Sequence, residues 1–258
     1  MQQQSGVRPA RPHTGVTADG RPLAEVLTYT RRGSRLNERQ ARAWADHADA
    51  WWIPDEAVDE PGFDVTACFG RDAPLVVEIG SGVGEATAAL AAARPGHNVL
   101  AFEVWHPGIA DTFTRLERAS VGNVRLMSVD AVWSMEHLLG PASVSELWTF
   151  FPDPWPKKRH HRRRLVNAGF ARLVASRLEQ GARWRLATDW PEYAERMAEV
   201  LDREPGLVNL HPGPAPRWED RPVTRFERRG RRAGRPVTDL SYARPAAAGG
   251  LGPGAPEA

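Results

Sequence analysis

The chain has 258 residues, of which 41% are hydrophobic and 26% are charged. These proportions are typical of a globular protein, and they exclude a fully disordered chain and an integral membrane protein. No apolar run approaches the length of a membrane-spanning helix. The N-terminus lacks the apolar core of a secretory signal, and the single cysteine, Cys68, cannot form an internal disulfide. We therefore expect a cytoplasmic protein.

The net charge of +2 conceals an uneven distribution of charge along the chain. Residues 1–42 contain 8 basic and 3 acidic residues, residues 43–156 contain 5 and 17, and residues 157–258 contain 21 and 12. An acidic middle between basic segments suits a small-molecule site beside a surface that binds a polyanion. Charge therefore favours nucleic acid as the partner, although 32 of the 34 basic residues are arginine, a bias that genome composition also produces.

The two ends of the chain differ in composition from its middle. Residues 1–24 are rich in Pro, Gly, Arg and Gln, and residues 245–258 are mostly Ala, Gly and Pro. Neither segment can bury enough apolar surface to order itself, so we expect a basic disordered tail and a second disordered tail. Residues 25–244 are expected to form a single domain, with an N-terminal arm over 25–73 and a core over 74–244 that ends in a hairpin.

Apolar runs and helical patterns alternate along the chain. In the arm, Asn37 is expected to cap a helix that runs through Gln40, Trp44 and Ala48. Apolar runs predict five buried strands: 75–79, 98–102, 124–129, 147–151 and 184–187. Ala-rich or amphipathic stretches predict five further helices: 85–93, 108–119, 131–139, 162–178 and 191–201. This alternation predicts a Rossmann-like, doubly wound α/β fold, with a mostly parallel sheet and helices on both faces.

A glycine-rich turn follows the first predicted strand. Gly80, Gly82 and Gly84 stand between this strand and a helix, where glycines let a ligand approach the backbone. A nucleoside cofactor is favoured there over an ordinary connecting turn. The spacing is G-x-G-x-G, which differs from the dinucleotide pattern G-x-G-x-x-G. Glu78, just before the turn, would also repel a pyrophosphate, so the pattern favours the cationic cofactor S-adenosyl-L-methionine.

Four acidic residues stand at or just beyond the ends of successive predicted strands. Glu78 precedes the glycine turn, Glu103 could accept hydrogen bonds from ribose hydroxyls, and Asp130 could accept one from an adenine amine. Asp153 lies in Phe-Pro-Asp-Pro-Trp-Pro, on a loop that three prolines stiffen. Each acid alone could be a helix cap. Because the carboxyl ends of parallel strands meet at one crevice, we expect the four together to line a ligand site.

A basic run follows this loop. Residues 157–164 read Lys-Lys-Arg-His-His-Arg-Arg-Arg and contain no acid, and Lys157 and Lys158 are the only lysines of the chain. A solvated helix face rarely lacks carboxylates over such a length, so the run is expected to contact RNA. His160 and His161 have no cysteine or carboxylate at ligand spacing, so we expect no metal site.

Taken in order, these segments resemble the bacterial tRNA (guanine-N7-)-methyltransferases, which are class I, S-adenosylmethionine-dependent enzymes. The likeness extends over about residues 25–244. It is carried by Glu-Ile-Gly-x-Gly-x-Gly, Phe-Glu-Val, Asp-Ala-Val, Phe-Pro-Asp-Pro-Trp-x-Lys, Ala-Thr-Asp-Trp and Arg-Pro-x-Thr-x-Phe-Glu-x-Arg-Gly. The chain departs from the family in having Trp105 where a histidine often follows the valine. Trp105 is expected either to lie near the adenosine or to cover the second helix.

The resemblance implies a methyl transfer from S-adenosyl-L-methionine to N7 of a variable-loop guanine in tRNA, with Asp153 as the catalytic aspartate. It implies that the following residues bind the cofactor: Glu78, Gly80, Gly82, Gly84, Glu103, Asp130 and Asp153. It implies that the following residues contact the substrate: Lys157, Asp189, Thr224, Arg225, Phe226 and Glu227. The RNA-contacting segment would comprise Arg159, His160, His161, Arg162, Arg163 and Arg164.

The residues also leave other interpretations open. Asp189 and Glu227 could accept hydrogen bonds from guanine N1–H or N2–H, or Asp189 could cap the next helix while residues 224–227 form a hairpin strand. The loop with Asp153 also suits an enzyme that methylates an exocyclic amine. A non-catalytic RNA-binding protein is a third possibility, and a nicotinamide dehydrogenase is the weakest. Both a monomer and a homodimer are compatible with the sequence.

Overall fold

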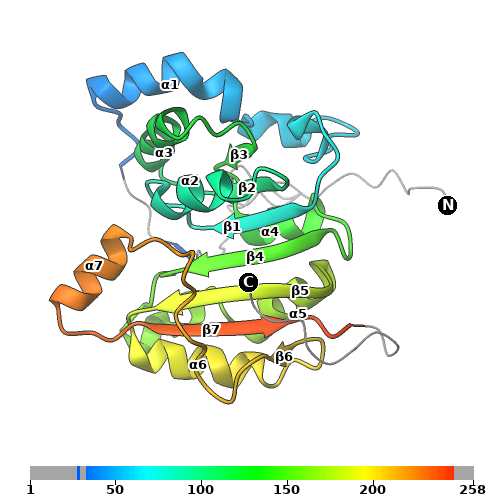
Figure 1. Ribbon diagram of the computed structural model, residues 1–258, viewed down its shortest axis with the longest axis vertical. Coiled ribbons are helices and arrows are strands. Elements are labelled where there is room, and N and C mark those ends of the chain that lie inside the picture. Colours follow the sequence, from blue (N-terminus) through cyan, green and yellow to red (C-terminus); the bar gives the residue numbers. More distant parts are fainter. Residues whose placement is uncertain (1–27, 30–32, 247–258) are drawn as a thin grey trace, which may run out of the picture.

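The structure is a computed structural model, and it describes residues 28–29 and 33–246. Both predicted tails lie outside these residues, apart from positions 245 and 246. Seven strands form one sheet in the order β3-β2-β1-β4-β5-β7-β6 (Figure 1). They are β1 Leu75–Ile79, β2 Asn98–Phe102, β3 Val124–Met127, β4 Val144–Phe150, β5 Leu178–Thr188, β6 Val208–Asn209 and β7 Thr238–Ala243.

The sheet is mostly parallel, as the alternation of elements predicted. Strands β1 to β5 pair in parallel, whereas β7 runs antiparallel to β5 and β6 runs antiparallel to β7. The first two strands have the predicted bounds, but β4 and β5 begin earlier than their apolar runs. Their early parts contain polar and charged residues, among them Glu146 of β4, which pairs across the sheet with Arg185 of β5. These early polar residues shortened the apolar runs on which the prediction rested.

Most helices follow strands along the chain, and they cover both faces of the sheet. They are α1 Glu38–Trp51, α2 Glu85–Ala92, α3 His106–Arg118, α4 Ala131–His137, α5 Ala168–Arg177, α6 Pro191–Leu201 and α7 Arg225–Arg232. Three short 3-10 helices are η1 Asp55–Asp59, η2 Ala67–Phe69 and η3 Lys158–Arg163. Asn37 caps α1 as predicted, because its Oδ1 accepts from Gln40 N at 2.9 Å and Gln40 Oε1 accepts from Asn37 N at 3.2 Å.

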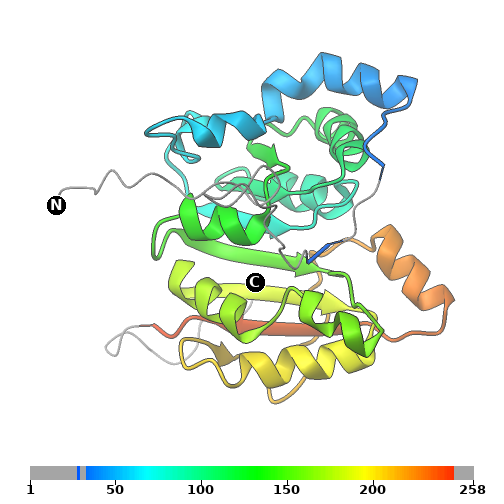
Figure 2. The same ribbon diagram turned by 180° about the vertical axis from the view of Figure 1, so that it is seen from behind.

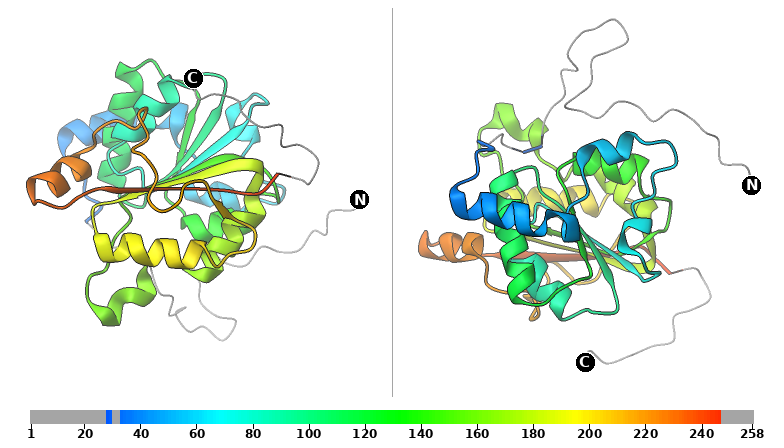
Figure 3. Two further views of the ribbon diagram at one scale, coloured as in Figure 1. Left: turned by 60° about the horizontal axis from the view of Figure 1, so that its bottom comes forward. Right: turned by 90° about the horizontal axis from the view of Figure 1, so that it is seen from above.

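Alternate side chains of each strand face two separate hydrophobic cores. On one face α1, α2 and α3 pack against the sheet through Trp51, Leu90, Phe113, Val76, Val99 and Trp148. On the other face α4, α5 and α6 pack against it through Met135, Val174, Met197, Val77, Leu100 and Leu147 (Figures 2 and 3). Burial on both faces explains why the central strands are continuous apolar runs in the sequence. None of the described helices combines the length and apolar character needed to cross a membrane.

Two predictions of local structure are wrong. The helix predicted from 162 begins only at Ala168, because Asn167 caps it by accepting from Phe170 N at 3.1 Å. The residues before it form η3 and a connecting turn. Residues 224–227 are not a hairpin strand, since Thr224 caps α7 and Arg225 begins it.

Helix α7 occupies the connection between β6 and β7, so the predicted C-terminal hairpin is an antiparallel pair with a helix in its loop. It projects beside the sheet at the carboxyl ends of the parallel strands (Figures 1 and 2). This position brings its first turn to the edge where the strand order reverses between β1 and β4.

Candidate functional site

A pocket opens at this edge of the sheet, between the glycine turn, the loops after β2, β3 and β4, and the first turn of α7. Its apolar wall consists of Ile79, Phe102, Val129, Phe150 and Leu165. Three predicted acids, Glu103, Asp130 and Asp153, also line it. Open α/β sheets bind their ligands at such a switch point, so this pocket is the candidate active site.

The glycine turn forms one side of the pocket. Gly80 and Gly82 line it with φ angles of 82° and 63°, a left-handed conformation that glycine adopts without strain. Gly84 has a different task, because a Cβ on it would lie 2.4 Å from Cγ2 of Thr112. Gly80 and Gly82 therefore expose backbone to a ligand, whereas Gly84 allows α2 to pack closely against α3.

The carboxylates of Glu103 and Asp130 are held by backbone N–H groups. Glu103 Oε2 accepts from Gly82 N at 2.6 Å, and its Oε1 accepts from Trp105 N at 2.9 Å. Asp130 Oδ1 accepts from Trp133 N at 3.0 Å and caps α4. Because a carboxylate oxygen can accept more than one hydrogen bond, both groups are fixed in place and still able to bind a ligand. Asp130 therefore both caps α4 and lines the pocket.

Glu78 lies deeper than the other acids. It is 2% exposed, and its Oε2 accepts from Thr87 Oγ1 at 2.6 Å. Burial raises the pKa of Glu78 to about 7. The charge of Glu103 also raises this pKa, whereas the hydrogen bond from Thr87 lowers it. Glu78 lines a small cavity behind the glycine turn, which adjoins the main pocket and also contains Ser81. Within the part of the chain that the structure describes, the buried Ser81 Oγ has no hydrogen-bond partner.

Asp153 lies on a loop that is held in an unusual conformation. Phe151 and Trp155 have φ angles of 54° and 44°, which cost free energy for residues other than glycine. Phe151 N donates to Ala187 O at 2.7 Å at one end of the loop. At the other end, Trp155 Nε1 donates to Thr28 O at 3.1 Å. Contacts at both ends thus fix the backbone that carries Asp153 into the pocket.

Arg164, which the resemblance assigns to the RNA-contacting segment, is buried and supports the same loop. Its side chain is 3% exposed, and its Nε donates to Pro154 O at 2.9 Å. Its two terminal nitrogens bind the carboxylate of Glu192 at 2.9 and 2.5 Å, and the guanidinium lies over the ring of Tyr193. The loop that carries Asp153 and helix α6 therefore enclose Arg164, although its place in the basic run predicted an exposed position.

The rest of the basic run divides into exposed and half-buried residues. Lys157, Arg159 and Arg162 are exposed, and none of them lines the pocket. Arg163 lies 3.6 Å from the ring centroid of Trp155, and its Nη2 donates to Tyr29 O at 3.0 Å. Half-buried residues of the run are His160, His161 and Arg163. Only part of the run is therefore free to meet a polyanion.

The first turn of α7 covers the pocket from the other side. Arg225 and Phe226 both line it, and the Arg225 guanidinium lies 4.9 Å from the ring centroid of Phe226 and 5.7 Å from that of Trp105. Trp105 itself lines the pocket, and its Nε1 donates to Gly33 O at 3.1 Å.

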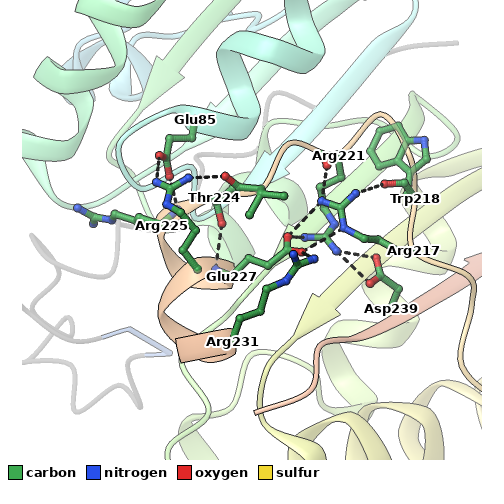
Figure 4. Close-up of polar contacts among 11 residues, drawn as sticks. Glu85, Arg217, Trp218, Arg221, Thr224, Arg225, Glu227, Arg231 and Asp239 are labelled. Atoms are coloured by element: carbon green, nitrogen blue, oxygen red, sulfur yellow. Dashed lines mark hydrogen bonds and ion pairs between the residues drawn. The ribbon is translucent and has the colours of Figure 1, made fainter. Parts of the chain in front are cut away.

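The other three predicted substrate residues do not line the main pocket. Glu227 is fully buried and accepts hydrogen bonds from three arginines, whereas the resemblance implies that it contacts the substrate (Figure 4). Asp189 Oδ2 accepts from Arg235 Nε and Nη2 at 2.9 and 2.6 Å. Thr224 Oγ1 caps α7 by accepting from Glu227 N at 3.4 Å, and Thr224 also lines the small cavity.

Sequence reasoning missed several neighbours of the site. Thr28 and Tyr29 of the N-terminal arm line the pocket, although nothing in their sequence context indicates it. Sequence reasoning also did not place Arg217 and Arg221 beside Glu227. One signal was present, since Arg231 stands four residues after Glu227, a spacing that places opposite charges together on a helix.

The pocket fits S-adenosyl-L-methionine by its chemistry. Apolar walls suit an adenine ring, fixed carboxylates suit hydroxyls, an amine and positive charges, and the unpaired Ser81 Oγ lies where one end of a ligand could reach it. Over the described ranges, no three His, Cys, Asp or Glu side chains are grouped to hold a metal ion.

Solved structures with the same fold are methyltransferases. The 16S rRNA methyltransferase KamB superposes with a TM-score of 0.51 at 16% identity, over 72% of this chain and 97% of that one. The 16S rRNA (adenine(1408)-N(1))-methyltransferase from Catenulisporales acidiphilia gives a TM-score of 0.50 at 16% identity, over 72% and 92%. Residues 72–240 match the model of the family described as "Putative methyltransferase". The chain is therefore a class I methyltransferase with a Rossmann-like fold.

Curated relatives narrow this class. A tRNA (guanine-N(7)-)-methyltransferase of Nocardioides sp. is 64% identical over 94% of this chain and 97% of its own length. Proteins of the same name from Cutibacterium acnes and Bordetella pertussis are 50% and 41% identical, over 85% and 88% of this chain. The chain belongs to the tRNA (guanine-N(7)-)-methyltransferase family.

Proposed function

We propose that this enzyme transfers the methyl group of S-adenosyl-L-methionine to N7 of a guanine in the variable loop of tRNA. The observation that carries the proposal is the convergence of Asp153, Glu103 and Asp130 on one pocket with the glycine turn. Exposed cations of η3 follow directly from the loop of Asp153, which supports a polyanionic substrate at the same edge of the sheet.

Different residues of the pocket would bind different parts of the methyl donor. When bound, S-adenosyl-L-methionine supplies an electrophilic sulfonium methyl group. Glu103 would accept from the ribose hydroxyls and Asp130 from the adenine amine, while the backbone of Gly80 and Gly82 allows close approach. Glu78 would meet the cationic methionine end through the small cavity. These acids suit a cation and disfavour a phosphate.

Guanine N7 carries an unprotonated lone pair, so the reaction requires no general base. The enzyme's contribution is then to align N7 with the methyl group and to stabilise the positive charge that develops on the base. Asp153 is placed for this task, because its loop is fixed at both ends and its side chain lines the pocket. Arg225 and Phe226 cover the pocket from α7 and limit the access of water.

The tRNA would bind by its backbone across the exposed cations near the pocket. On η3 and the preceding loop these are Lys157, Lys158, Arg159 and Arg162. On α7 the exposed arginines are Arg228, Arg229, Arg231 and Arg232. Contacts of this kind position the RNA without reading its sequence, and the target guanine must then leave its stack to reach Asp153.

The proposal is tested with purified enzyme, labelled S-adenosyl-L-methionine and an unmodified tRNA transcript. After nuclease digestion, mass spectrometry should identify 7-methylguanosine. Asp153→Asn should reduce the rate by at least 100-fold, since the negative charge near the reacting base is lost while the shape is kept. Asp49→Asn, a change on the exposed face of α1, is the matched control and should leave the rate unchanged.

A methyl group on an exocyclic amine would contradict the proposal in favour of a different RNA methyltransferase. tRNA binding without any transfer, at saturating S-adenosyl-L-methionine, would favour a binding protein. Full activity of Asp153→Asn would remove the catalytic role from that residue and leave the product assignment standing.

A further inference from the structure

Glu227, which the family resemblance assigns to the substrate, is bound by arginines within the protein and lies on helix α7. We propose that Glu227 is a positioning residue, which acts through Arg217 and Arg221 to fix α7 so that Arg225 and Phe226 form a wall of the methyl-donor pocket. The inference rests on the proposed function only in taking this pocket as the site of S-adenosyl-L-methionine.

Both oxygens of the Glu227 carboxylate are engaged within the protein. Oε2 accepts from Arg221 Nη1 at 2.6 Å, and Oε1 accepts from Arg217 Nε at 3.1 Å and from Arg231 Nη2 at 2.5 Å. The side chain is 0% exposed. A carboxylate that recognises a guanine edge must be reachable by the base, and this one is enclosed by guanidinium groups.

Arg221 connects the helix to the sheet. It is 1% exposed, and its Nη2 donates to both oxygens of Asp239 at 3.0 Å (Figure 4). Asp239 belongs to β7 and stands opposite Ala187 of β5 in the antiparallel register. The chain of contacts from Glu227 through Arg221 to Asp239 therefore ties the buried side of α7 to the start of β7, beside the end of β5.

The charges of this cluster keep Glu227 ionised. Burial by itself raises the pKa of Glu227, but the hydrogen bond from Arg217 and the charges of Arg221 and Arg231 together hold this pKa below its usual value. Loss of the negative charge would leave Arg221 with a single carboxylate partner in a buried position. The excess positive charge of the remaining arginines then favours movement of the helix toward solvent.

A shift of α7 would reach the pocket directly. Glu85, the first residue of α2 after the glycine turn, accepts from Arg225 N at 2.5 Å and from Arg228 Nη2 at 2.6 Å. Phe226 packs over the turn itself, where a Cβ at Gly82 would lie 3.6 Å from its ring. The first turn of α7 is thus attached to the glycine turn at one end and to the buried cluster at Glu227.

Cofactor affinity and base preference together separate positioning from substrate contact. We expect Glu227→Gln to weaken binding of S-adenosyl-L-methionine about 10-fold or more by isothermal titration, and to leave the choice of methylated base unchanged. A direct contact with guanine predicts the reverse, with unchanged S-adenosyl-L-methionine affinity and an altered base preference. The reverse result overturns the inference.

Asp239→Asn provides a second variant, because Asp239 acts on the same arginine from β7 and does not line the pocket. It should weaken S-adenosyl-L-methionine binding in the same direction. Since both changes break one chain of contacts, the double variant should lose much less than the product of the two single losses. Additive losses of S-adenosyl-L-methionine affinity would contradict a shared route through Arg221. If Glu227→Gln fails to fold, Asp239→Asn alone still tests the inference.

A control distinguishes a positioned helix from a generally weakened protein. Val144→Ala removes buried side-chain volume at the start of β4, the end of that strand remote from the pocket. It should lower the melting temperature and leave S-adenosyl-L-methionine affinity unchanged. If the wild-type enzyme itself fails to bind S-adenosyl-L-methionine, the proposed function fails; if it binds and Glu227→Gln binds equally well, only this inference fails.

Discussion

Glu78 is a residue of the site that lowers the stability of the fold when it is ionised. A buried carboxylate is costly when it is ionised, and burial raises the pKa of Glu78 to about 7, whereas a free glutamate titrates near 4.5. In the folded state without a ligand, the protonated form is therefore favoured below about pH 7. Its contribution to stability is fully present below pH 4.5 and is lost as the pH rises through 7.

We expect Glu78→Gln to remove this pH dependence. The wild-type protein should lose about 2 to 3 kcal/mol of stability through this group between pH 5 and pH 8, since each pKa unit corresponds to 1.36 kcal/mol. Urea unfolding of both proteins at the two pH values measures the difference. Parallel pH profiles for the two proteins would show that Glu78 ionises normally in the fold.

At the scale of elements, the pocket depends on close packing between the glycine turn and helix α3. A Cβ at Gly108, near the start of α3, would lie 2.2 Å from the carbonyl oxygen of Gly82. Gly84 is equally crowded by Thr112 of the same helix. Two glycines in different elements therefore allow α3 to support the backbone that a ligand approaches, which the glycine motif alone does not reveal.

Gly108→Ala should push α3 away from the turn. We expect a loss of about 1 to 3 kcal/mol in the free energy of unfolding, as for other overpacked sites, together with weaker binding of S-adenosyl-L-methionine. Gly122→Ala is the matched control, because nothing lies within 4 Å of a Cβ there. Chemical denaturation and titration calorimetry measure both effects. Normal cofactor affinity in Gly108→Ala would mean that the turn tolerates displacement of α3.

At the scale of the whole molecule, the fold places basic segments and the acidic pocket at one edge of the sheet. The basic run that follows β4 looks uniform in sequence, but it serves two purposes. Arg159 and Arg162 are exposed, whereas Arg164 is buried against Glu192 and holds the loop of Asp153 through Pro154. Only the exposed cations can release counterions when a polyanion binds.

The two kinds of arginine should therefore respond differently to substitution. Arg159→Ala combined with Arg162→Ala should weaken tRNA binding and reduce the slope of log K against log salt by roughly 1 to 2, because two phosphate contacts are lost. Arg164→Met should keep this slope but lower thermal stability and kcat. The contrast is tested by measuring the Kd for tRNA between about 50 and 200 mM salt, because such slopes are resolved in this range. An equal loss of slope in Arg164→Met would place that residue on the RNA.

The sequence by itself determined the alternation of strands and helices from β1 to α6, the parallel core and the positions of the acids at the strand ends. Buried parallel strands are continuous apolar runs, so β1 and β2 were predicted to the residue. The placement of Glu103, Asp130 and Asp153 in one pocket followed from the same rule, since parallel strands end at a common edge.

Only the tertiary structure decided which charged residues face outward. Arg164, Arg221 and Glu227 are charged side chains of a kind usually found at the surface, but each is buried because an oppositely charged partner neutralises it. The pairs Arg164–Glu192 and Arg221–Asp239 join residues 28 and 18 positions apart and leave no periodic signal along the sequence. Burial of an ion is set by where its partner lies in space, and that is a property of the folded chain alone.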